Sequence, residues 1–248
     1  MEGAFSGRVV VVTGAARGLG RDYARFFAAD GANVVLAEVR NLDGALAEVE
    51  AAASGSRCMA VEADVTDRSS VDALVGRAVD ELGRFDVLVN HAGLWRGLSA
   101  AGLLYCPPQL WQAAWAVNMT GTLLSCQAAV PAMAANGFGR VVNMSSMASR
   151  SGGNPYGVTK NAVEHMTKGM VREVGHLGIT VNCVAPGISA SEAAKDAVPD
   201  AADIVATIAV PRLGTSRDLY AALAYLCSEA ASWVTGEVLR VDGGSRTG

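Results

Sequence analysis

A tyrosine and a lysine four positions apart, Tyr156 and Lys160, are the residues of this chain best suited to proton transfer. On a helix this spacing places both side chains on one face, one turn apart. A phenol with its ordinary pKa near ~10 is a poor base at neutral pH. A neighbouring ammonium favours the phenolate and lowers that pKa. The pair therefore predicts a general base that takes the proton of an alcohol.

The position of this pair is more informative than its spacing, which an ordinary amphipathic helix also shows by chance. It follows a predicted strand, Val141–Met144, that ends in two serines, Ser145 and Ser146. Ligands of open parallel sheets bind beyond the carboxyl ends of the strands. We therefore expect the hydroxyls, the phenol and the ammonium to meet at that edge.

A glycine-rich turn from Thr13 to Gly20 follows the apolar run Val9–Val12 and opens an amphipathic stretch. The run predicts a buried strand, and glycines let the chain turn tightly into a helix. Free N–H groups and a positive dipole end then suit a pyrophosphate. The spacing G-x-x-x-G-x-G differs from the common G-x-G-x-x-G fingerprint. A turn without a ligand is the alternative interpretation.

Glu38 ends the second predicted strand, twenty residues after Gly18. An acidic residue near this offset accepts hydrogen bonds from the adenosine ribose hydroxyls of a dinucleotide. A carboxylate there repels a 2′-phosphate and favours NAD over NADP. Arg17 and Arg40 favour the opposite choice, because either could pair with that phosphate. We give the carboxylate more weight and expect turnover with NADH to exceed turnover with NADPH.

Short apolar strands alternate with helical patterns along the chain, which predicts an α/β fold. Nearly all-apolar strands are typical of a parallel sheet covered on both faces, and right-handed crossovers make that sheet doubly wound. No linker interrupts the pattern, so we expect one domain over residues 1–248. The seven predicted strands are Val9–Thr13, Asn33–Ala37, Cys58–Glu62, Val87–Asn90, Val141–Met144, Thr180–Val184 and Val238–Val241.

Two long helices are expected in the second half of the chain. One spans Gln109–Ala135, with a bend near Pro131, and the other spans Tyr156–Leu177 and ends at Gly178. The segment 189–207 is the least regular part of the sequence and is a candidate substrate lid.

Composition limits the classes of partner. The net charge of −4 argues against nucleic acid and anionic membranes, and no apolar stretch approaches the ~20 residues of a membrane span. Residues 1–7 lack the features of a secretory signal. Five scattered cysteines without C-x-x-C spacing indicate reduced thiols in the cytoplasm, and three histidines without ligand spacing indicate no metal site.

Seven short motifs follow one another in a recognisable order. They are the turn from Thr13 to Gly20, Ala63-Asp64-Val65, Asn90-His91-Ala92-Gly93, Asn118-Met119-Thr120-Gly121, the Tyr156/Lys160 pair, the stretch from Asn182 to Gly187, and Val241-Asp242-Gly243-Gly244. They cover essentially the whole chain and resemble the short-chain dehydrogenase/reductase family. The resemblance implies a Rossmann-like fold and hydride transfer between a nicotinamide cofactor and an alcohol or ketone.

The resemblance also implies a role for each matching residue. Tyr156 would be the general acid/base, while Lys160 would lower its pKa and bind the nicotinamide ribose. Ser146 would orient the substrate oxygen, and Asn118 would hold a water that links Lys160 to solvent. The remaining cofactor contacts would come from Gly14, Arg17, Gly18, Leu19, Gly20, Glu38, Asp64, Val65, Asn90, Ala92, Gly93, Pro186, Gly187, Ile188 and Ser191.

Two features depart from the family pattern. His91 stands where the family has a second asparagine, and we expect it to be structural rather than catalytic. The segment 147–155, which forms one wall of the substrate pocket, is shorter than in relatives. Because that shortening could move Ser146, Ser145 remains an alternative partner of the substrate oxygen.

Our principal hypothesis is an NAD-dependent oxidoreductase acting on a neutral secondary alcohol or its ketone in an apolar pocket near Leu94, Trp95 and Leu98. One alternative is an NADP-dependent carbonyl reductase. Another is a nucleotide-sensing protein without turnover, although a sensor has no need of a complete proton-transfer set. The apolar residues around Leu104 and Trp111 exceed what one domain needs, and family members commonly pair such helices, so we expect a homotetramer.

Overall fold

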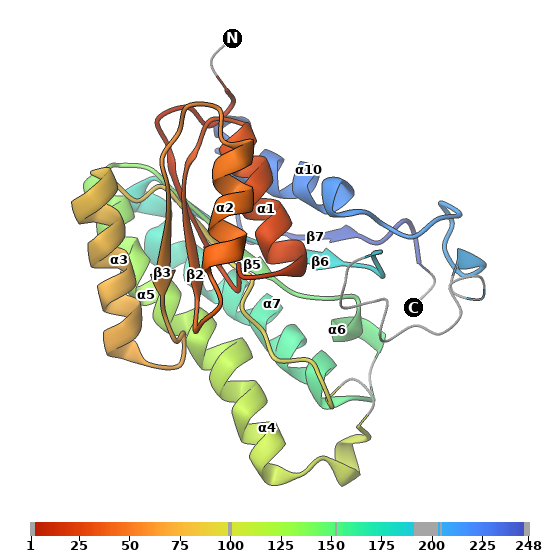
Figure 1. Ribbon diagram of the computed structural model, residues 1–248. Helices are drawn as coiled ribbons and strands as arrows, with labels where there is room; N and C mark the ends of the chain where they lie inside the picture. The colour runs from red at the N-terminus through yellow and green to blue at the C-terminus, as the bar shows by residue number, and fades with distance from the viewer. Residues whose placement is uncertain (1–2, 99–100, 152, 191–202, 204, 246–248) are drawn as a thin grey trace.

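A parallel sheet in the order β3-β2-β1-β4-β5-β6-β7 organises the protein (Figure 1). The computed structural model describes residues 3–98, 101–151, 153–190, 203 and 205–245. All neighbouring strands in this part of the chain are paired in parallel, which confirms the predicted fold class. The strands are β1 (Val9–Thr13), β2 (Asn33–Glu38), β3 (Cys58–Glu62), β4 (Val87–Asn90), β5 (Gly139–Met144), β6 (Ile179–Pro186) and β7 (Val238–Val241).

Helices cover both faces of the sheet. Successive side chains of a strand point to opposite faces, so an all-apolar strand presents apolar side chains on both. Val10 and Val12 pack with α1 (Gly18–Ala29), α2 (Asp43–Ala52) and α10 (Ser216–Cys227) on one face. Val9 and Val11 pack with α3 (Arg68–Leu82), α5 (Gly121–Ala135) and α7 (Pro155–Val174) on the other. The strands are therefore apolar on both sides, as a doubly wound sheet requires.

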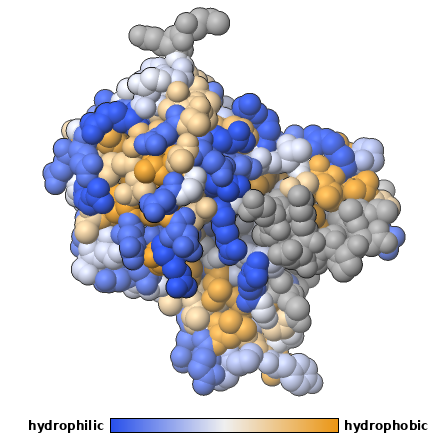
Figure 2. Space-filling view, viewed as in Figure 1, coloured by the Kyte–Doolittle hydropathy of each residue, from blue (hydrophilic) through white to orange (hydrophobic). Residues whose placement is uncertain are grey.

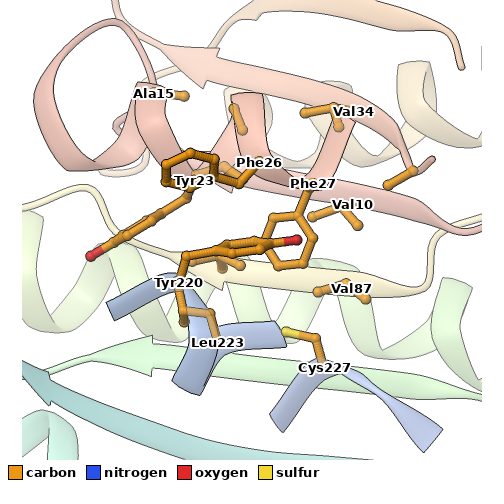
Figure 3. Close-up of a cluster of buried hydrophobic side chains, with 14 of the residues drawn as sticks. Val10, Ala15, Tyr23, Phe26, Phe27, Val34, Val87, Tyr220, Leu223 and Cys227 are labelled. Carbon is orange, nitrogen blue, oxygen red and sulfur yellow. The ribbon is translucent and has the colours of Figure 1, made fainter. Parts of the chain in front are cut away.

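Aromatic side chains anchor α1 against α10 (Figure 3). The rings of Phe27 and Tyr220 meet edge to face with centroids 5.0 Å apart, and Phe5 meets Phe27 in the same way at 5.0 Å. The hydroxyl of Tyr220 donates to Asp30 at 2.6 Å. These contacts hold α1 against α10. Because the glycine turn leads directly into α1, they also position the turn.

The long helix predicted over Gln109–Ala135 is continuous but not uniform. It consists of α4 (Pro108–Trp115), a π-helical segment, η2 (Ala116–Thr120), and α5. Pro131 lies within α5, so the chain stays helical through the proline, and the expected bend there stays a prediction. Segments of π-helix add a residue to one turn and often accompany functional sites.

Short elements of the described chain include η1 (Leu103–Tyr105), α6 (Ala148–Ser151), η3 (Gly175–Leu177) and η4 (Glu229–Ala231). The predicted helix over Tyr156–Leu177 is α7 followed by η3, and it ends at Gly178 as expected. Most of the candidate lid, residues 191–202 and 204, lies outside the described residues. No helix in the described ranges is long and apolar enough to span a bilayer.

Candidate active site

A cleft opens at the carboxyl edge of the sheet, where β1 and β4 lie side by side and the chain connections diverge. Ligands of doubly wound sheets bind at such a switch point. The cavity has a volume of about 790 Å³, within the range of small-molecule sites. The predicted site residues on its wall are Gly14, Arg17, Gly18, Leu19, Glu38, Asp64, Val65, Ala92, Gly93, Ser146, Tyr156, Lys160, Pro186, Gly187 and Ile188.

The glycine turn forms one end of the cleft, where Gly14 and Gly18 have no side chain to fill it. Gly14 has a positive φ of 71°, and a Cβ atom there would lie 2.8 Å from the Cα of Ala92. Gly20 does not line the cleft; a Cβ on it would collide with the Gly14 carbonyl, so its role is to let α1 pack under the turn. Arg17, the N-cap residue of α1, makes no side-chain cap. Backbone N–H groups at the start of α1 thus remain for an anion.

Acidic side chains stand at the last residue of β2 and just beyond the end of β3. Glu38 lines the cleft, and its Oε1 accepts from the backbone N–H of Val39 at 2.9 Å. Asp64 lines it too and accepts from the Thr66 N–H at 2.8 Å. Of the two arginines considered for a 2′-phosphate, Arg17 is on the wall and Arg40 is not among the lining residues.

The loop after β4 brings the backbone of Ala92 and Gly93 to the wall, but not the side chain of Asn90. Asn90 is buried, and its Nδ2 donates to Asn143 Oδ1 at 2.9 Å, which links β4 to β5. The hydroxyl of Thr13 accepts from the N–H of Ala92 at 3.1 Å and ties β1 to this loop. Asn90 therefore holds the start of this loop in place from the protein interior, through its hydrogen bond with Asn143.

Tyr156 and Lys160 lie on the first turns of α7 and both face the cleft. The helix begins there because Asn154 caps it, its Oδ1 accepting from the Gly157 N–H at 2.8 Å, and because Pro155 suits the first helical position. The buried Nζ of Lys160 donates to the Met144 carbonyl at 2.8 Å and lies 5.6 Å from the centroid of the Tyr156 ring.

The electrostatics differ from the sequence-based expectation that Lys160 lowers the pKa of Tyr156. Burial raises the pKa of Tyr156 to about 12, opposed by a side-chain hydrogen bond with Ser146. Burial also lowers the pKa of Lys160 to about 8. The Lys160 ammonium donates to the Met144 carbonyl. In the protein without cofactor, desolvation of the Tyr156 phenolate therefore outweighs its attraction to that ammonium.

The two adjacent serines have different partners. Ser145 is buried, and its hydroxyl lies 2.6 Å from Glu164 Oε1 and 3.3 Å from the Lys160 carbonyl. Ser146 is half-buried and hydrogen-bonds with Tyr156, and its Oγ accepts from the Ala148 N–H at 3.2 Å. This arrangement favours Ser146 over Ser145 as the hydroxyl that meets a substrate oxygen.

Asn118 lies behind the cleft rather than on its wall. Its Oδ1 accepts from the Leu94 N–H at 2.7 Å, and its Nδ2 donates to the Leu94 carbonyl and to Thr159 Oγ1, each at 2.9 Å. The π-helical segment carries this side chain inward, where it ties the β4 loop to α7. Its role in holding a water stays a prediction.

His91 lines the cleft near the glycine turn. Its ring meets that of Tyr23 edge to face at 5.4 Å, and burial, with the nearby charge of Lys160, lowers its pKa to about 4. The imidazole is therefore neutral at physiological pH and packs as part of the wall. Its structural rather than catalytic role stays a prediction.

Sequence reasoning missed several wall residues and placed others correctly. Leu94, Trp95 and Arg96 line the cleft, whereas Leu98 is buried beneath it. The missed residues include Val39, Val117 and Met144, whose apolar side chains carry no chemical signal in the sequence. Ser191 lies outside the described residues. Across the described ranges, no group of three or more His, Cys, Asp or Glu side chains is placed to hold a metal.

Comparisons with known proteins agree with this geometry. A family profile described as enoyl-(acyl carrier protein) reductase matches residues 14–246. An uncharacterised oxidoreductase of Mycobacterium tuberculosis is 39% identical over 97% of this chain and 98% of its own length. A 3-oxoacyl-[acyl-carrier-protein] reductase of Synechocystis is 35% identical over 97% of this chain and 98% of its own length.

The solved structure of a short-chain type dehydrogenase/reductase from Mycobacterium ulcerans superposes with a TM-score of 0.92 and 30% identity, covering 97% of this chain and 90% of that one. The chain belongs to the short-chain dehydrogenase/reductase family. It is an oxidoreductase that uses a nicotinamide dinucleotide, NAD or NADP. The cleft fits that cofactor: the side-chain-free cradle at Gly14 and the uncapped start of α1 suit its pyrophosphate.

Proposed function

We propose that the enzyme transfers a hydride between NAD(H) and a neutral secondary alcohol or its ketone. The observation that carries this proposal is the meeting of Tyr156, Ser146 and Lys160 in the same cleft as the glycine turn and Glu38. A phenol, a hydroxyl and a cation at one edge of the sheet supply proton transfer, orientation and charge.

Bound in the cleft, the nicotinamide cofactor supplies the hydride donor or acceptor. The residues of the chain handle the proton and the substrate oxygen. With its pKa near 12, the Tyr156 phenol is protonated at neutral pH and donates to the oxygen of a ketone. Ser146, oriented by the Ala148 N–H, hydrogen-bonds the same oxygen. Lys160, held by the Met144 carbonyl, is placed to bind ribose hydroxyls.

The choice of NAD over NADP rests on Glu38. Its carboxylate lines the cleft at the end of β2, where it can accept from two ribose hydroxyls and repels a 2′-phosphate. Two arginines could oppose this preference by pairing with a 2′-phosphate. Arg17 is exposed on the described wall of the cleft, whereas Arg40 is not among the described lining residues. Arg17 also borders the pyrophosphate end, where a cation serves either cofactor.

The wall near Tyr156 favours an uncharged, apolar substrate. It carries Leu94, Trp95 and Ile188, and the arginine found on the described part of this wall, Arg96, is exposed. A second candidate is a 3-oxoacyl thioester, because a relative is named for that reaction and the matching family profile is named for an acyl-carrier enzyme. Arg96 is the described cleft residue that could meet a phosphate of such a carrier.

A substrate panel tests both candidates. Purified enzyme is assayed with secondary alcohols and NAD, with ketones and NADH or NADPH, and with a short 3-oxoacyl thioester. We expect turnover of apolar ketones, faster with NADH than with NADPH. A preference for NADPH contradicts the assignment of Glu38, and turnover of the thioester alone favours the second candidate. Binding of NADH without turnover of any substrate favours a nucleotide sensor.

We also propose a homotetramer. Leu104 and Tyr105 in η1 are 91% and 86% exposed, and Trp233 near β7 is 97% exposed. Contiguous apolar patches on a protein surface mark sites of interaction with another surface. Figure 2 shows apolar surface on the region where α4 projects from the body of the protein. Two separate apolar faces are what a tetramer needs.

A further inference from the structure

The segment that carries Ser146 is tied to α7 through one buried carboxylate. Glu164 lies on α7, one helical turn beyond Lys160, and is 7% exposed. Its Oε1 accepts from the hydroxyls of Ser145 and Ser149, each at 2.6 Å. These distances are typical of hydroxyls that donate to a carboxylate. None of the ion pairs found among the described residues involves Glu164.

Ser146 lies between the two anchored serines. The Ser146 carbonyl accepts from the Ser149 N–H at 3.0 Å, and the Ser146 hydroxyl accepts from the Ala148 N–H at 3.2 Å. The turn that orients the Ser146 hydroxyl is thus fastened to Glu164 at both ends. Moving that carboxylate frees the turn, and with it the hydroxyl that meets Tyr156.

Close packing reinforces this attachment. Gly157, in the first turn of α7, leaves room for the carbonyl of Ala148, which a Cβ at that position would strike. Asn161 Nδ2 donates to the Ser149 carbonyl at 3.4 Å. Only nine residues, 147–155, connect Ser146 to Tyr156, so the segment has little freedom to find another position.

We propose that Glu164 is a positioning residue of the reaction: it sets the Ser146 hydroxyl against Tyr156 by holding Ser145 and Ser149. This role rests on the proposed function, because it acts through the proton-transfer site. Glu164 acts through these two serines and is not among the residues that line the described cleft. Its removal lowers the catalytic rate with a ketone but leaves the NADH end of the cleft unchanged.

The test measures kcat and the KM for NADH with a ketone from the panel, for wild type, Glu164→Leu, Glu164→Gln and Ser149→Ala. A 1 Å displacement of a catalytic group can cost a hundredfold in rate, so we expect Glu164→Leu to lose about tenfold or more in kcat. The KM for NADH should stay within about twofold, since uniform binding is untouched. Glu164→Gln keeps one oxygen acceptor and should recover part of the rate.

A double-mutant cycle separates positioning from general destabilisation. In a Ser146→Ala background, Glu164→Leu should cause little further loss of kcat, because the hydroxyl it positions is gone. Equal losses in both backgrounds overturn the proposal. Glu173→Leu, the same chemical change at an exposed site of α7, is the matched control and should keep wild-type rates.

Ser149→Ala keeps the proposal testable if Glu164→Leu does not fold, as judged by circular dichroism. It removes one donor from a half-buried position and should lower kcat several-fold, again only when Ser146 is present. If the wild type is active and Glu164→Leu has unchanged rates, the positioning role is refuted and the proposed function stands. If Glu164→Leu does not fold, unchanged rates in Ser149→Ala refute the positioning role in the same way. A wild type inactive on the whole panel refutes the proposed function, and the positioning role with it.

Discussion

At the scale of single residues, two neighbouring serines show how position decides chemistry. Both serines border the cleft, but Ser145 is buried and hydrogen-bonds Glu164, while Ser146 is half-buried and hydrogen-bonds Tyr156. We expect Ser146→Ala to lower kcat by about 10²-fold or more, as the loss of a preorganised donor does at other enzymes. Ser145→Ala should cost thermal stability and only a few-fold in kcat. Steady-state kinetics and melting curves of both variants check this, and a larger kcat loss in Ser145→Ala contradicts it.

The pKa of Tyr156 predicts opposite pH dependences for the two directions of reaction. A phenol with a pKa near 12 is protonated throughout the neutral range and ready to donate to a ketone. Oxidation of an alcohol needs the phenolate, whose fraction rises about tenfold per pH unit below the pKa. We therefore expect kcat/KM for oxidation to rise between pH 7 and 9 while reduction stays nearly constant from pH 6 to 8.

Initial rates in both directions, in buffers of constant ionic strength, test this pH dependence. Tyr156→Phe removes the titrating group and should abolish both activities without changing NADH binding. A flat oxidation profile in the wild type shows that another group controls the proton.

The residue types of the site could be predicted from the sequence, but not the direction in which each side chain points. Tyr156, Lys160 and Ser146 reach the cleft, because helix and strand periodicity place them at the carboxyl edge of the sheet. Asn90 and Asn118 belong to the same motifs, yet their amides turn inward and bind other parts of the protein. Motif spacing places a backbone near a site; hydrogen-bond partners distant in sequence decide where the side chain goes.

At the scale of elements, the junction of β1 and α1 is the most demanding part of the fold. Gly14 combines a left-handed backbone with close approach to Ala92. We expect Gly14→Ala to lose about 1–3 kcal/mol of unfolding free energy, from strain and displacement of the β4 loop, and to weaken NADH binding. Gly76→Ala, in α3 with open space around its position, should instead gain about 0.5–1 kcal/mol.

Denaturant unfolding and NADH titration of both glycine variants provide the measurement. If Gly14→Ala is as stable as the wild type, the turn can adopt another conformation. The conclusion that a glycine at this position shapes the pyrophosphate site is then wrong.

The elements themselves could be predicted where apolar patterns are pure. β1, β3, β4 and β7 have the predicted bounds, because each is an apolar run or alternation. β5 begins at Gly139, two residues earlier than predicted. Pairing with β6 and the packing of the Arg140 guanidinium on the Phe138 ring, 4.1 Å from its centroid, extend the strand. Both are tertiary contacts, which an apolar pattern does not predict. The π-helical segment at Ala116–Thr120 also carries no sequence pattern of its own.

At the scale of the whole molecule, two apolar regions lie on different elements. One is η1 with the start of α4, and the other is the edge strand β7 with the preceding loop. Among the described residues β7 pairs only with β6, so within this part of the chain its other edge carries unpaired backbone groups beside the exposed Leu239. Each region can pair with its copy about a two-fold axis, and two such axes build a closed tetramer.

Substitutions in each region should therefore stop assembly at a different stage. We expect the wild type to elute as a tetramer at micromolar concentration, and Trp233→Asp and Leu104→Asp each to yield dimers, because a buried unpaired carboxylate disfavours one interface. The double variant should be monomeric. Size-exclusion chromatography with light scattering measures the masses, with Ala73→Asp on the exposed side of α3 as the control. A wild-type monomer refutes the assembly, and a tetramer that survives both substitutions places its interfaces elsewhere.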